Sequence, residues 1–152
     1  MDIHAVIADF RQAASLAGID LSPEMITVEV NRPPHAPPGS LPAGKMAVYI
    51  FQWGNQCLKI GKVGPKSQAR YTSQHYSPKS CNSNLAKSIL KDKNSLGLIE
   101  LTEDTVGGWI KRHTDRVNIL IDEAVGTPVL SLLESFLQCR LKPRFEGFES
   151  QR

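Results

Sequence analysis

Tyr49, Lys59 and Arg70 are the residues whose types and spacing most favour chemistry. A phenol and an amine can exchange protons, and a guanidinium binds a phosphate group through two parallel hydrogen bonds. Tyr49 precedes Lys59 by ten residues, and Lys59 precedes Arg70 by eleven. A hairpin brings the first two side chains together, and a helix after the hairpin brings Arg70 to the same cleft.

The sequence around these residues predicts that hairpin and that helix. Residues 46–52 and 56–62 are rich in apolar side chains and are separated by Trp53-Gly54-Asn55, which suits a tight turn. Pro65 is typical of the first turn of a helix, and we expect this helix over 66–76.

Three motifs in this order resemble the GIY-YIG nuclease superfamily. Val48-Tyr49-Ile50 and Lys59-Ile60-Gly61 resemble its two short triads, and Arg70 follows on the next helix. Residues 134–145 resemble its C-terminal motif, in which a metal-binding glutamate on a helix precedes a Pro-Arg-aromatic run. Here these are Glu134 and Pro143-Arg144-Phe145. The resemblance covers residues 46–148, about two thirds of the chain.

The resemblance implies a metal-dependent DNA endonuclease that hydrolyses phosphodiester bonds. Glu134 would hold Mg²⁺ or Mn²⁺, Arg70 would bind the scissile phosphate, and Tyr49 with Lys59 would activate water. Leucines at helical spacing around Glu134 predict a packed helix over 127–141 that presents this glutamate on its polar side.

The sequence departs from the usual family pattern at three positions. Lys59 occupies the tyrosine position of the second triad, which shifts the role of base towards Tyr49. Glu146 stands where many members have asparagine. His75 follows Arg70 by five residues, whereas helical neighbours are three or four apart. His75 is therefore either a catalytic residue or a surface histidine.

The predicted fold class is α+β, with a small antiparallel sheet of about three strands flanked by helices. An apolar run at 116–122 predicts the third strand, and 84–92 predicts a short helix. Residues 102–111 also have a helical pattern, but Gly107-Gly108 favours a break.

Residues 1–44 read as an extension before a nuclease-like domain at 45–152. They comprise a predicted helix at 2–17, a strand at 25–30 and a proline-rich linker. The extension could cap an edge of the sheet, form a dimer contact or help to hold DNA. A homodimer would bring two sites to the two strands of a duplex.

The basic residues are distributed unevenly, although the chain of 152 residues has a net charge of only +3. Between residues 59 and 93 there are eight lysines and arginines and one acidic residue, Asp92. Local basic surface makes phosphate contacts, so we expect DNA contacts from Lys62, Lys66, Lys79 and Lys87. The alternative is a solvated lysine-rich face.

The cysteines and the hydropathy indicate a cytoplasmic setting without a membrane partner. There are three cysteines and no CxxC pair, which favours free thiols in a reducing compartment. Cys57 and Cys139 lie in apolar runs and are predicted core residues. No stretch reaches the length of a membrane span.

Two other functions remain open from the sequence. The first is a nucleic-acid-binding module of the same fold without catalysis, which Lys59 and Glu146 at the departing positions favour. The second is an interaction protein in which residues 1–44 form the working surface. Salt-dependent DNA affinity separates the DNA-binding functions from the interaction protein, and metal-dependent cleavage separates a nuclease from a binding module.

Overall fold

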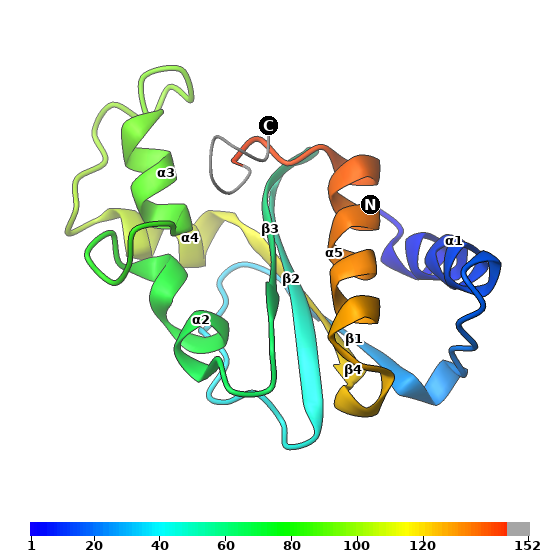
Figure 1. Cartoon of the computed structure of the whole chain (residues 1–152). Coiled ribbons are helices and arrows are strands. Elements are labelled where there is room, and N and C mark those ends of the chain that lie inside the picture. Colours follow the sequence, from blue (N-terminus) through cyan, green and yellow to red (C-terminus); the bar gives the residue numbers. More distant parts are fainter. Residues whose placement is uncertain (146–152) are drawn as a thin grey trace.

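Four strands form one antiparallel sheet in the computed structural model, which describes residues 1–145 (Figure 1). The order across the sheet is β1-β4-β2-β3, and the strands are β1 (Ile26–Asn31), β2 (Lys45–Trp53), β3 (Gln56–Val63) and β4 (Asp115–Asp122). The α+β class is as predicted, with one strand more than expected. The additional strand is β1, which pairs with β4 along its whole length and so belongs to the same sheet.

The helices cover the two faces of this sheet (Figure 1). Helices α1 (Ile3–Leu16) and α5 (Thr127–Leu141) pack on one face, which we call the α5 face. Helices α2 (Gln68–Thr72), α3 (Leu85–Lys91) and α4 (Val106–His113) pack on the other, which we call the α2 face. Each face buries its own hydrophobic core, because side chains alternate between the faces along each strand.

The strand register determines which residues share the α2 face. Glu29, Asn118, Tyr49 and Gly61 form one row across the four strands. The adjacent row contains Arg116, Phe51 and Lys59. Lys62 is opposite Val48 in the register and therefore lies on the α5 face.

Three local predictions need correction. The helix expected at 66–76 is split into α2 and a 3₁₀ turn at Gln74–Tyr76. Helix α4 runs through Gly107-Gly108 without a break. A Cβ at Gly107 would lie 2.3 Å from the Tyr76 carbonyl oxygen, so the glycine permits α4 to approach the 3₁₀ turn. Cys57 is buried as predicted, but Cys139 is exposed.

The remaining predicted elements are confirmed to within one or two residues, including the first helix, which Asp2 caps as an acceptor from two backbone amides. Helix α5 also matches its predicted bounds. Among the described residues, no helix combines the length and apolar character needed to cross a membrane.

Candidate active site

The Tyr49 side chain lies against the edge strand β3 at Gly61, where any residue larger than glycine would clash with it. Its side chain is 2% exposed, and its ring lies over Gly61, the opposite residue in the strand register. A Cβ added at Gly61 would be 2.2 Å from the Tyr49 hydroxyl oxygen. The hydroxyl can therefore reach the edge of the sheet because residue 61 has no side chain.

We expect Gly61→Ala to lower the free energy of unfolding by about 1–3 kcal/mol, the usual range for overpacking. Gly64→Ala is the matched control, because a Cβ there meets nothing within 4 Å; its effect should stay within about 0.5 kcal/mol. Urea unfolding followed by circular dichroism measures both. Equal stabilities of the two variants would contradict the close approach of Tyr49.

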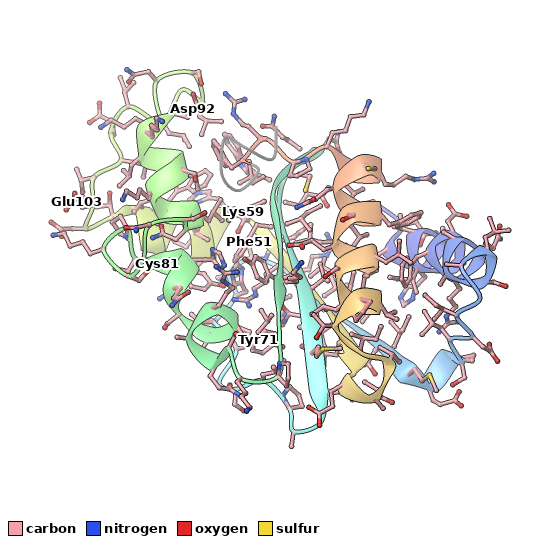
Figure 2. All side chains as sticks on the ribbon, in the orientation of Figure 1. Phe51, Lys59, Tyr71, Cys81, Asp92 and Glu103 are labelled. Atoms are coloured by element: carbon pink, nitrogen blue, oxygen red, sulfur yellow. The ribbon has the colours of Figure 1, made fainter. Side chains whose placement is uncertain are left out.

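Lys59 is a buried lysine beside Tyr49 on the α2 face. It is 4% exposed and lies opposite Phe51; Figure 2 shows both between the sheet and the helices of that face. Burial lowers its pKa, and the nearby charge of Arg70 lowers it further. None of the ion pairs among residues 1–145 includes Lys59.

Arg70 is exposed on α2, and its charge acts on the residues of this site. Burial raises the pKa of Tyr49, and Arg70 partly offsets this rise. Arg70 also contributes to the lowered pKa values of Lys59 and His75, in which burial is the largest cause. Arg70 forms no ion pair with another described residue, so its guanidinium can receive an anion.

Glu134 approaches the same edge from the α5 face. Its carboxylate forms an ion pair of 2.9 Å with Lys62, and the Lys62 ammonium also donates a hydrogen bond of 3.0 Å to the Ser131 hydroxyl. The negative charge of Glu134 adds to the burial-driven rise in the Tyr49 pKa. Glu134 therefore acts electrostatically on Tyr49, although α5 and the Tyr49 side chain lie on opposite faces of the sheet.

His75 is buried, which excludes the surface histidine that was one alternative from the sequence. It is 2% exposed, and its ring centroid is 4.5 Å from that of Tyr49. Its Nδ1 accepts a hydrogen bond of 3.3 Å from the Leu85 backbone amide, so the proton of the neutral ring is on Nε2, which has no partner among the described residues. Burial, with the charges of Lys59, Arg116 and Arg70, lowers its pKa to about 3.

The four lysines predicted to contact DNA have different environments. Lys66 and Lys87 are exposed, and none of the described ion pairs includes them. Lys79 is exposed and pairs with Glu103 at 2.9 Å. Lys62 is half-buried in its ion pair with Glu134. Of these four lysines, Lys62 alone forms an ion pair with a candidate site residue within residues 1–145.

The C-terminal motif lies along the start of β3. The backbone amides of Arg144 and Phe145 donate to the carbonyls of Cys57 and Leu58 at 3.0 and 2.8 Å, and the Arg144 side chain binds Asp92. This motif therefore covers the beginning of the edge strand, at Cys57 and Leu58. Glu146 lies outside the described residues.

Sequence reasoning missed Arg116, which is buried beneath Tyr49 with its guanidinium carbon 5.9 Å from the Tyr49 ring centroid. A single arginine at the start of an apolar strand gives no pattern that distinguishes a buried from an exposed charge. No group of three or more His, Cys, Asp or Glu side chains in the described part of the chain could hold a metal ion. Comparison of the chain with protein-family models, with curated proteins and with solved structures gave no match.

Proposed function

We propose that this protein is a metal-dependent DNA endonuclease of the GIY-YIG type, which hydrolyses phosphodiester bonds at the edge of β3. The observation that carries the proposal is the edge of β3 at Gly61, where Tyr49 lies over the strand and Lys62 binds Glu134, with Lys59 on the same strand and Arg70 on the helix that follows it. These residues come from four different elements. Burial is the largest cause of the pKa shifts of Tyr49 and Lys59, and the charges of Arg70 and Glu134 contribute to both shifts, which supports a shared site.

Glu134 fits the needs of Mg²⁺ or Mn²⁺. Magnesium usually binds one or two carboxylates and keeps waters or substrate phosphate oxygens as its other ligands, so a lone glutamate is compatible with it. The Glu134 side chain is 18% exposed, and its carboxylate is paired with the Lys62 ammonium, which a metal ion would have to displace. When bound, the metal ion would act as a Lewis acid on a phosphate oxygen.

Arg70 would bind the scissile phosphate. Its guanidinium is exposed and has no described carboxylate partner, and arginine binds phosphate oxygens bidentately. In this position it balances the negative charge that increases in the transition state. Lys66 and Lys87 would contact the backbone phosphates on either side.

Tyr49 and Lys59 would together activate the attacking water. The sequence favours Tyr49 as the base, but burial raises the Tyr49 pKa, so the phenol stays protonated at neutral pH and its oxygen would orient the water instead. Burial lowers the Lys59 pKa, which increases its neutral fraction and suits it to accept a proton. The water oxygen then bonds to phosphorus, its proton moves to Lys59 Nζ, and the bond to the leaving oxygen breaks, with the electron pair going to that oxygen, which takes up a proton from solvent.

Cleavage of a supercoiled plasmid with Mg²⁺ or Mn²⁺ tests the proposal, with Glu134→Gln beside the wild type. We expect nicked or linear DNA with the wild type only, and loss of cleavage with EDTA. Cleavage that persists in Glu134→Gln would contradict the assignment of the metal ligand. DNA binding without cleavage under any metal would favour a nucleic-acid-binding module, which the Lys62 ion pair on Glu134 also supports.

We expect Lys62→Met to tighten Mn²⁺ binding several-fold. The Lys62 ammonium lies 2.9 Å from the Glu134 carboxylate and competes with a metal ion for it; a partly exposed ion pair is worth up to about 1 kcal/mol. Titration of free Mn²⁺ by electron paramagnetic resonance measures the affinity without cleavage. Lys66→Met is the control and should bind like the wild type. Unchanged affinity in Lys62→Met would exclude the competition.

A further inference from the structure

Arg116 of β4 is a charged side chain with no exposed surface. Its guanidinium carbon lies 5.3–5.9 Å from the ring centroids of four aromatic residues, Tyr49, Phe51, Tyr71 and Tyr76. Taking a charge out of water costs several kcal/mol, and an apolar side chain of similar volume is often as stable or more stable. The aromatic faces offset part of this cost. Stability alone therefore does not explain an arginine at this position.

The hydrogen bonds of Arg116 reach three different elements. Its Nε donates to the Asn118 side-chain oxygen at 2.9 Å, and its Nη1 donates to the Tyr76 hydroxyl at 3.1 Å. Its Nη2 donates to the backbone carbonyl of Tyr71. None of the ion pairs among residues 1–145 includes Arg116. Through its hydrogen bonds the guanidinium connects the sheet with α2 and with the 3₁₀ turn at Gln74–Tyr76, which we call the two turns that follow β3.

The two anchored residues are next to candidate site residues. Tyr71 follows Arg70 in α2, and Tyr76 follows His75 in the 3₁₀ turn. Helix α2 has only five residues and no side-chain cap, and so short a helix is not stable by itself. Its position, and with it the position of Arg70, must therefore come from contacts with the rest of the fold.

The hydrogen-bond chain continues into residues 1–44. The Thr114 carbonyl can only accept, so His35 donates to it from Nδ1 at 2.9 Å, and His35 Nε2 then accepts from the Tyr76 hydroxyl at 2.9 Å. On the other side, Asn118 donates from its side-chain nitrogen to Glu29 at 3.2 Å. Every hydrogen bond of this network, from Glu29 to Thr114, thus has a definite donor and acceptor.

We propose that Arg116 is a positioning residue that holds the two turns carrying Arg70 and His75 against the sheet, supported by Glu29 and His35 of the N-terminal segment. The catalytic consequence rests on the proposed function, but the anchoring does not. Arg116→Lys keeps the charge and loses the planar fork, so one ammonium cannot reach all three acceptors. Tyr76→Phe removes one hydroxyl and retains the ring.

Hydrogen exchange measured by mass spectrometry tests the anchoring in both variants. The amides of Tyr71, Ser73 and Tyr76 are hydrogen-bonded within the two turns. We expect peptides covering 68–76 to exchange at least about tenfold faster than in the wild type, relative to peptides from β2 and β4. A uniform acceleration over the whole chain, or none, would overturn the proposal. If Arg116→Lys does not fold, Tyr76→Phe decides by the same criterion.

Cleavage kinetics then test the catalytic consequence with a double-mutant cycle. We expect Arg116→Lys to lower kcat about tenfold or more with little change in KM, and to lower it by less than about threefold when Arg70→Ala is already present. Full additivity would show that Arg116 does not act through Arg70 and would overturn the catalytic part of the proposal. Absence of cleavage by the wild type would refute the proposed function, and the exchange measurement would still decide the anchoring.

Discussion

Arg70→Ala is expected to slow phosphodiester cleavage by about 10²–10³-fold, the usual cost of removing one group that stabilises transition-state charge. The loss should be in kcat, because Arg70 is proposed to bind the reacting phosphate. Arg70 is exposed and forms no described ion pair, so the free energy of unfolding should change by no more than about 0.5 kcal/mol. Single-turnover cleavage of a labelled duplex measures the rate.

Lys66→Ala is the matched control for this experiment. Lys66 is also an exposed cation just before α2, but it is proposed to contact a neighbouring phosphate. We expect it to weaken DNA binding and to reduce the slope of log affinity against log salt by about one, with little change in the cleavage rate. If Arg70→Ala behaves in the same way, Arg70 is a DNA-binding residue and not the clamp on the scissile phosphate.

The free energy of unfolding is expected to fall by several kcal/mol between pH 6.5 and about pH 3 because of His75. Burial lowers its pKa from 6.5 to about 3 in the folded protein. Below pH 6.5 the unfolded chain therefore binds a proton that the folded chain rejects, and stability falls as the pH falls. At about 1.4 kcal/mol for each pH unit, the full loss is on the order of 5 kcal/mol.

Comparison with His75→Gln isolates this effect from the carboxylates that titrate in the same range. The variant lacks the titrating ring, so its unfolding free energy should depend less on pH between 6.5 and 4. Burial also lowers the pKa of His35, so a smaller dependence of the same sign should remain. Urea unfolding at several pH values provides the measurement. Parallel pH profiles of the variant and the wild type would show that His75 is not buried in its neutral form.

Local patterns in the sequence determined the hairpin and the long C-terminal helix. Gly and Asn at the turn and apolar residues on both sides specify β2 and β3, and leucines at helical spacing specify α5. These signals depend on residues close together in the chain. The hairpin and the helix could therefore be predicted without knowledge of the fold. The residue types that the proposed chemistry needs could also be identified from the sequence.

Which residues meet was decided by the tertiary structure. The pairing of β1 with β4 joins segments about ninety residues apart, and no local pattern specifies it. The burial of Lys59, His75 and Arg116 follows from the packing of short helices over one face of the sheet, which the types of these residues do not favour. The sequence thus determined which groups are available for chemistry. Only the register of the β2–β3 hairpin and the packing on it decided that Tyr49 lies over Gly61, because a shift of one residue would put another side chain opposite Tyr49.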